Sequence, residues 1–139
     1  MATEAPLLHH SQCTAGVNMS STGGLNGFNG SGQFLVVGFT ATRSVVIPLN
    51  ATIQPAGILQ NDPISGFVAD IGFLGITKVI AGVVTSVVAG APVMAEASTG
   101  GRVIVFGTPA TNIAVGYAME TPAAINNVIM MMVAPLVLD

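Results

Sequence analysis

Glycine and proline interrupt this chain so often that they decide what it can fold into. The 139 residues include 17 glycines and 8 prolines, dispersed along the sequence. Proline breaks a helix interior and glycine weakens it, so little room is left for a long helix. Short apolar runs rich in β-branched residues lie between the interruptions, and such residues favour strands. The pattern predicts an all-β fold.

From residue 34 onward, apolar runs recur at the spacing of about 8–12 residues that is typical of barrels and sandwiches. We therefore expect a small β-barrel or sandwich of short antiparallel strands, with at most one short helix, at residues 91–95 or 122–126. Many runs are apolar on both faces, which is typical of strands covered on both sides, inside a barrel or against neighbouring subunits. The expected strands span residues 34–39, 44–48, 57–59, 67–71, 75–80, 83–88, 103–106, 113–119 and 128–133.

The composition changes near residue 33. Residues 1–33 hold six glycines with serine, threonine and asparagine between them, which is typical of a flexible or extended arm. We therefore divide the chain into an N-terminal arm, residues 1–33, and a β-rich domain, residues 34–139. Leu25 and Phe28 are spaced along the arm like anchors. The arm is either a solvated tail or a segment that orders against a partner.

Charge is scarce throughout the sequence. Three lysine and arginine residues and six aspartate and glutamate residues give a net charge of −3. Electrostatic binding of nucleic acid needs clustered cations, so we expect no nucleic-acid partner. A β domain with so thin a polar surface would expose large apolar patches as a monomer, and such patches usually mark contact sites. We therefore expect oligomerisation or docking on a larger assembly.

The longest uncharged stretches do not predict membrane spans. Residues 79–95 and 103–119 carry no charge, but a spanning helix needs about 20 apolar residues, and glycine and proline interrupt both stretches. No positively charged flanks set a topology, and the N-terminus lacks the pattern of a signal peptide. We expect no membrane partner.

No motif in the chain predicts an enzyme or a metal site. His9, His10 and Cys13 lie close in sequence, but adjacent residues of an extended chain point in opposite directions, and zinc needs four organised ligands. We interpret them as exposed arm residues, and Cys13 as a thiol without a catalytic base. Four acidic residues of the β domain lie on different expected segments, where solvated carboxylates are the default. They are Asp62, Asp70, Glu96 and Glu120.

Two further features are interpreted as packing. Lys78 stands within an expected strand, and we expect it to reach an edge or a subunit boundary rather than act as a buried amine. Residues 130–132, three methionines, indicate adaptable core or interface packing, because copper thioether sites usually include histidine or cysteine. We expect no catalytic residue, no cofactor and no metal.

Short glycine-containing motifs follow one another in the rest of the chain. They are Gly-Ile-Leu-Gln-Asn-Asp-Pro at 57–63 with Gly66, Gly-Ile-Thr-Lys-Val-Ile-Ala-Gly at 75–82, Gly-Ala-Pro-Val at 90–93, Gly-Gly-Arg at 100–102, and Ala-Val-Gly-Tyr-Ala-Met-Glu at 114–120, before a closing apolar strand. Their order and spacing resemble the small capsid decoration, or cement, proteins of tailed phages. The chain departs from that family at Ala91, where an acidic residue is usual, and in its glycine-rich arm.

The resemblance implies a non-enzymatic β-rich protein on the outer surface of an icosahedral head, bound to the major capsid protein. Such proteins commonly form trimers, sometimes dimers, where capsid subunits meet, and they brace the shell. Leu25 and Phe28 would be arm anchors, and Lys78 and Arg102 would contact capsid neighbours. Six glycines would hold turns or bulges: Gly57, Gly66, Gly75, Gly82, Gly90 and Gly116.

Two alternative functions remain open. An adhesin or carbohydrate-binding module on a virion surface would need exposed aromatic rings to stack on sugars, but the chain has no tryptophan and only Tyr117 as tyrosine. A small β-barrel enzyme would depend on one of four acidic residues, and changing that residue would abolish its activity: Asp62, Asp70, Glu96 or Glu120.

Overall fold

The computed structural model describes residues 7–17, 19, 32–47, 53–82, 87–96, 100–107 and 113–137. This part of the chain is all-β and contains no helix, which confirms the predicted fold class. It therefore has no helix long and apolar enough to cross a membrane. The strands are β1 (Leu8–Ala15), β2 (Val36–Ala41), β3 (Ser44–Val46), β4 (Pro55–Leu59), β5 (Val68–Ile80), β6 (Pro92–Ala95), β7 (Val103–Val105), β8 (Ile113–Ala118) and β9 (Val128–Val137).

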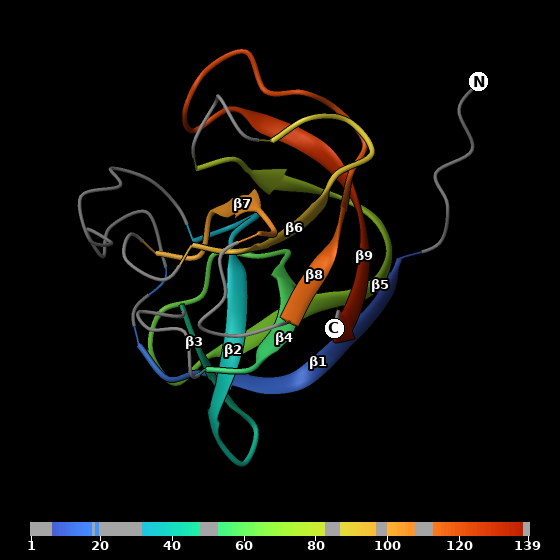
Figure 1. Cartoon of the computed structure of the whole chain (residues 1–139). Coiled ribbons are helices and arrows are strands. Elements are labelled where there is room, and N and C mark those ends of the chain that lie inside the picture. Colours follow the sequence, from blue (N-terminus) through green and yellow to red (C-terminus); the bar gives the residue numbers. More distant parts are fainter. Residues whose placement is uncertain are drawn as a thin grey trace.

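Five strands form a closed barrel, which we name the first ring. Its strands pair in the order β1–β3–β2–β4–β5, and β5 pairs with β1 again. Thr14 lies at the closure, because it is the partner of Ser44 in β3 and of Val68 in β5. The strands β1 to β4 occupy the lower half of the view in Figure 1.

A second ring shares β5 with the first. β5 has 13 residues: its first part pairs with β1, and residues 75–80 pair with β9. From β9 the order continues through β8, β6 and β7. An isolated bridge between Ala81, directly after β5, and Val103 in β7 connects the end of the series back to its start. The second ring is thus closed by one bridge, where the first has a paired strand.

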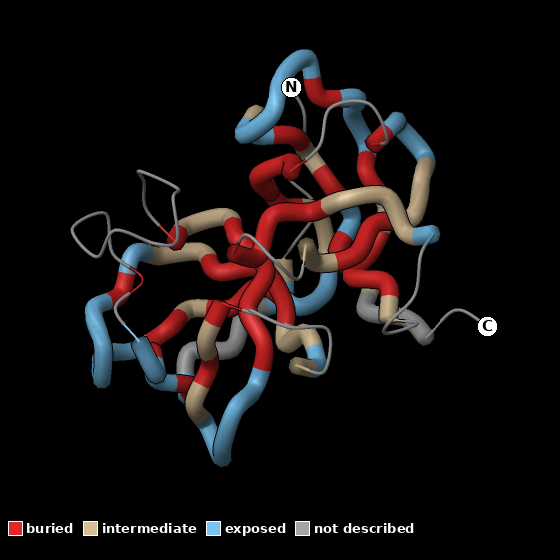
Figure 2. The backbone as a smooth tube through the Cα atoms, turned by 60° about the vertical axis from the view of Figure 1, so that its left-hand side comes forward, coloured by how far each residue is buried: buried red, intermediate tan, exposed pale blue. Residues whose placement is uncertain are grey.

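Each ring encloses its own hydrophobic core. The first core contains Cys13, Ala15, Met19, Leu35, Val37, Val45, Ile47, Leu59, Ala69, Ile71 and Ile80. The second core contains Val36, Ile58, Val79, Ala81, Val87, Val93, Val103, Val115, Ala118, Ile129, Met131 and Val133. Buried residues are concentrated where the two rings meet, and exposed residues lie at the ends of the molecule (Figure 2).

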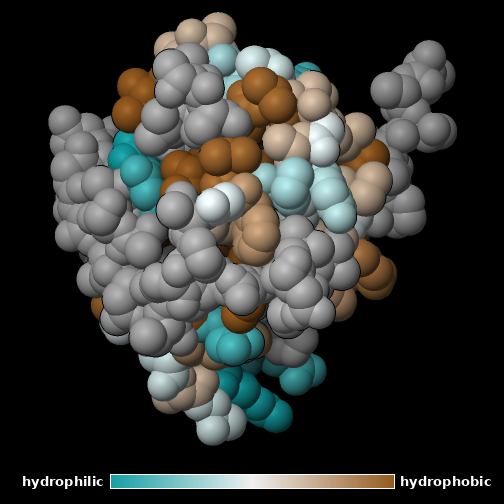
Figure 3. Space-filling view, viewed as in Figure 1, coloured by the Kyte–Doolittle hydropathy of each residue, from teal (hydrophilic) through white to brown (hydrophobic). Residues whose placement is uncertain are grey.

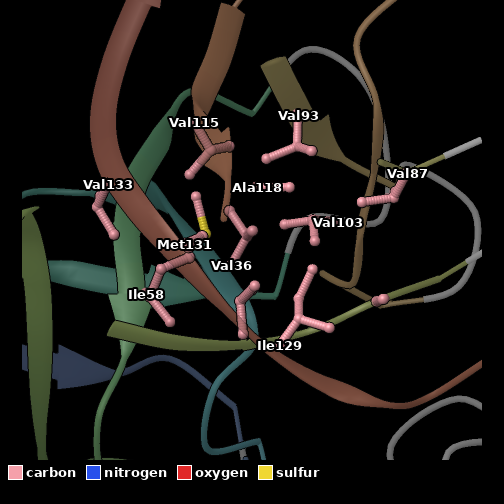
Figure 4. Close-up of a cluster of buried hydrophobic side chains, with 12 residues drawn as sticks. Val36, Ile58, Val87, Val93, Val103, Val115, Ala118, Ile129, Met131 and Val133 are labelled. Atoms are coloured by element: carbon pink, nitrogen blue, oxygen red, sulfur yellow. The ribbon is translucent and has the colours of Figure 1, made fainter. Parts of the chain in front are cut away.

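The shared wall between the cores explains why the sequence is apolar on both strand faces. Side chains of successive strand residues point to opposite faces. In β2, Val36 enters the second core and Val37 the first, and Ile58 and Leu59 of β4 divide in the same way. Figure 4 shows Val36 and Ile58 beside Met131 of β9. Part of the low charge is therefore explained by burial within one chain.

Several predicted elements were wrong. Residues 91–95, a helical candidate, contain strand β6, because Val93 and Met94 pair with Val105 and Ile104 of β7. Residues 122–126 form bends and turns. The expected strands 67–71 and 75–80 fall on one continuous strand, β5, which begins at Val68. Val87 and Val88, from the expected strand 83–88, lie outside any strand, and residues 83–86 are outside the described part.

The N-terminal segment contributes a strand that the sequence did not predict. Residues 8–15 of the expected arm form β1, which is built into the first ring. The glycine-rich run that contains Leu25 and Phe28 lies outside the described residues, so their anchoring role stays a prediction. The same holds for a domain boundary at residue 33.

Candidate attachment surfaces

The motif at residues 57–63 builds the connection between β4 and β5. The Gln33 side chain donates a hydrogen bond to the Gln60 carbonyl at 2.7 Å, and the Thr77 hydroxyl donates to Gln60 Oε1 at 3.0 Å. The Asn61 side chain donates to the Val68 carbonyl and accepts from the Asp70 backbone N–H, both at 2.9 Å. These bonds satisfy polar groups between the two strands, so the motif's polar residues have a structural role.

The six predicted turn glycines occupy different kinds of position. Gly66 and Gly90 lie in turns with φ of 82° and 86°. Gly57, Gly75 and Gly116 lie inside strands, and Gly82 follows β5. At Gly57 an added Cβ would meet the Gly72 carbonyl oxygen of β5, and at Gly116 the Met132 carbonyl oxygen of β9. Glycine at these two positions lets neighbouring strands approach closely.

Arg102 is held inside the molecule. Its Nε donates to Glu96 Oε2 at 2.9 Å and its terminal nitrogen to Asn126 Oδ1 at 2.8 Å. Only 11% of the Arg102 side chain and 14% of the Glu96 side chain are exposed. This network joins the end of β6, the start of β7 and the turn before β9, next to the bridge that closes the second ring. Arg102 therefore has little surface left for an outside contact.

Lys78, the other predicted cationic contact, is exposed on β5. Its Nζ lies 5.9 Å from the centre of the Phe34 ring, at the outer limit of a cation–π contact. It pairs across the sheet with Met130 of β9. Lys78 is the better candidate of the two for a contact with another molecule.

Among the described residues, Cys13 and the carboxylates do not gather into a reactive site. Cys13 is buried in the first core, so its predicted exposure was wrong; burial raises the pKa of its thiol, and Arg43 lowers it by less. The buried thiol is thus kept protonated and unreactive. Asp62 and Glu120 are exposed, Asp70 is half-buried in β5, and Glu96 is paired. Within the described residues, no group of three His, Cys, Asp or Glu could hold a metal ion.

One end of the first ring carries exposed apolar side chains on fixed backbone. We name Val17, Ile64, Phe67 and Val68 the barrel-end patch; their exposed fractions range from 43% to 63%, with Phe67 the highest. The Gly66 N–H donates to the Ala15 carbonyl, and the Ala15 N–H donates to the Phe67 carbonyl, each at 2.8 Å. Two main-chain bonds therefore hold this turn against the end of β1.

A second apolar surface covers the outside of β5, β9 and β8. We name it the outer sheet face: Leu74, Ile76, Lys78, Tyr117, Met119, Val128, Met130 and Met132. Leu74, Met119, Val128 and Met132 are each almost half exposed. Apolar atoms are also exposed on the side shown in Figure 3, whose most hydrophilic region lies at the bottom, where Figure 1 places the hairpin of β2 and β3.

The sequence pointed to Lys78 and the methionines of the outer sheet face as contact residues, but it did not predict either surface as a whole. Ile64 follows a turn signal and Phe67 begins an expected strand, but an exposed apolar residue has the same sequence signature as a buried one. The three methionines were interpreted as core or interface packing. In the structure Met131 is buried in the second core, whereas Met132 is exposed.

The fold resembles a solved structure, the N base of head fiber gp8.5 of bacteriophage phi29. The match has a TM-score of 0.61 and covers 93% of this chain and 95% of that one, at 15% sequence identity. No protein-family model matches the chain. No curated protein matches it either. The likeness extends over nearly the whole of both chains and is one of fold.

Proposed function

We propose that this chain is a structural virion protein that binds the outer surface of an icosahedral phage capsid and stabilises the shell by bridging major capsid subunits. The observation that carries the proposal is the fold likeness to a phage head fiber base over nearly the whole of both chains. The order of the sequence motifs, which resembles capsid decoration proteins, supports the same class independently.

The barrel-end patch is the proposed site of attachment to the capsid. Its apolar side chains project from a turn fixed by main-chain hydrogen bonds, so binding requires little loss of backbone freedom. Burying these exposed apolar side chains between shell subunits would contribute about 25 cal/mol per Å². Repeated copies around one shell would add to its stability.

Binding to phage heads that lack this protein tests the proposal. The purified chain should cosediment with heads in a saturable way, raise the temperature at which they release DNA, and appear as density outside the shell in electron micrographs. Failure to bind, or density inside the shell, would contradict it.

A pair of matched variants tests the attachment site. Phe67→Asp should weaken head binding at least about tenfold, because it places a charge in an apolar contact. Phe39→Asp is the control: Phe39 is an exposed phenylalanine, at 49%, in β2, a strand that contributes no residue to the patch. Equal losses in both variants would reject the barrel-end patch as the site.

A further inference from the structure

The outer sheet face is one continuous surface centred on β9. Cross-strand partners project on the same side of a sheet. Met132 has Ile76 of β5 as its partner on one side and Tyr117 of β8 on the other. Burial alternates along β9: Ile129, Met131 and Val133 are buried, whereas Met132 is exposed. Met130 and Met132 therefore lie on the outside, with β5 and β8 flanking them.

Opposite charges lie at the same level on the two sides of β9. Lys78 is the cross-strand partner of Met130 on the β5 side. On the β8 side, Glu120 Oε2 accepts a hydrogen bond of 2.9 Å from the Met130 N–H. Within the described part of the chain, neither Lys78 nor Glu120 has an ion-pair partner. The face is thus an apolar strip with one cation and one anion on its two margins.

We propose that this face binds the same face of a second copy of the chain, about a two-fold axis that runs along β9. Rotation about this axis exchanges the two sides of the strand, so Lys78 of each copy comes to lie opposite Glu120 of the other. Side chains on β9, such as Met132, pack against their own counterparts. Ile76 of each copy meets Tyr117 of the other.

The charge pattern selects a second copy as the occupant. A two-fold interface must be complementary to itself, because each residue meets the surface that its own copy presents. One cation and one anion placed symmetrically about the axis meet this condition. A partner whose contact surface carries a single sign of charge would leave Lys78 or Glu120 opposed by like charge. Methionine side chains on the axis adapt their shape to a moving counterpart.

Sedimentation of the purified chain tests the contact. The wild-type protein should be a dimer, and Met132→Asp should weaken it about a hundredfold, because two carboxylates then meet at the axis. Ile64→Asp is the matched control, since Ile64 is exposed to a similar extent, 44% against 45%, but lies in the barrel-end patch. Circular dichroism should show folded protein in both variants. A monomeric wild type, or a trimer, would overturn the proposal.

Charge reversal provides a test in trans that does not depend on the apolar core of the contact. Lys78→Glu alone and Glu120→Lys alone should each weaken dimerisation about tenfold, because like charges then face each other twice. Mixing the two variants should restore a dimer, since every opposing pair is again of opposite sign. If the mixture dimerises no better than its components, Lys78 and Glu120 do not face each other.

This inference and the proposed function can fail separately. Dimerisation is measured on the protein alone, and head binding is measured with Met132→Asp as well as the wild type. The variant should still bind heads through the barrel-end patch, with weaker avidity because it does so as a monomer. If Met132→Asp dimerises normally but does not bind heads, the assignment of the outer sheet face to dimerisation is wrong. The proposal that the wild-type chain attaches to capsids is not affected by that result.

Discussion

The two rings differ in how they are closed. In the first ring a paired strand closes the barrel, because β1 is bonded to β3 on one side and to β5 on the other. In the second ring one isolated bridge and the Arg102 network close the series beside Ala81. Main-chain pairing tolerates almost any side chain, whereas the network depends on three particular residues. Both rings are built from paired strands, and they differ at the closure, where the second ring has a single bridge and a side-chain network beside it.

The largest effect is expected from breaking the closure of the first ring. Thr14→Pro removes the N–H that donates to the Arg43 carbonyl at 2.8 Å, and the proline ring disturbs pairing with β3 and β5. We expect a loss of at least about 3 kcal/mol in the free energy of unfolding, measured by urea denaturation. The control is Thr14→Ala, which keeps the backbone and loses one exposed side-chain bond.

The same variant also tests whether the rings unfold together. Because β2, β4 and β5 contribute to both cores, Thr14→Pro should lower hydrogen-exchange protection in β8 and β9 as well as in β1. Unchanged protection in β8 and β9 would mean that the second ring is independently stable.

A smaller loss of stability, similar in both rings, is expected where a glycine of one strand lies closest to the backbone of its neighbour. Gly57→Ala in the first ring and Gly116→Ala in the second should each lose about 2 to 3 kcal/mol, because the added Cβ meets a carbonyl oxygen of the neighbouring strand. Gly107→Ala is the control, since nothing lies within 4 Å of its added Cβ. Thermal unfolding by calorimetry gives the comparison. A stability change at Gly57 or Gly116 no larger than at Gly107 would show that the strands can move apart without cost.

The smallest effect is expected from opening the second ring. Arg102→Ala leaves Glu96 and Asn126 without their buried partner and should cost about 2 kcal/mol. Arg43→Ala, which removes an exposed arginine from the β2–β3 turn, should change the stability by less than about 0.5 kcal/mol. The double variant Glu96→Ala, Arg102→Ala should recover part of the loss. If Arg102→Ala matches Arg43→Ala, the network does not hold the ring.

Much of the fold was predictable because the strand predictions rested on the local preference of β-branched residues. The β-branched runs at residues 44–48, 103–106 and 113–119 contain the strands β3, β7 and β8. Strand β1 was missed because His9, His10 and Gln12 give it a polar sequence, and its place in the barrel depends on pairing with β5, whose residues lie 54 to 66 positions away. Strand β6 was mistaken for a helix for the same reason: β7 and β8 decide its conformation.

The candidate surfaces were less predictable than the fold. The sequence indicated that apolar surface would be available for partners, and exposed apolar side chains are present. It could not distinguish Met131 from Met132, because which of two adjacent residues faces the core depends on strand register. Arg102 and Lys78 were treated alike, yet one is enclosed by Glu96 and Asn126 and the other reaches the surface.

The sequence by itself determined that this protein is all-β and poor in charge, because glycine, proline and β-branched residues act on their own backbone. Only the tertiary structure decided where the many apolar residues are placed. Some of these apolar residues form two cores that share a wall, and others are exposed on the barrel-end patch and the outer sheet face. Burial is a property of residues brought together from distant positions, so the number of apolar side chains follows from the sequence and their placement does not.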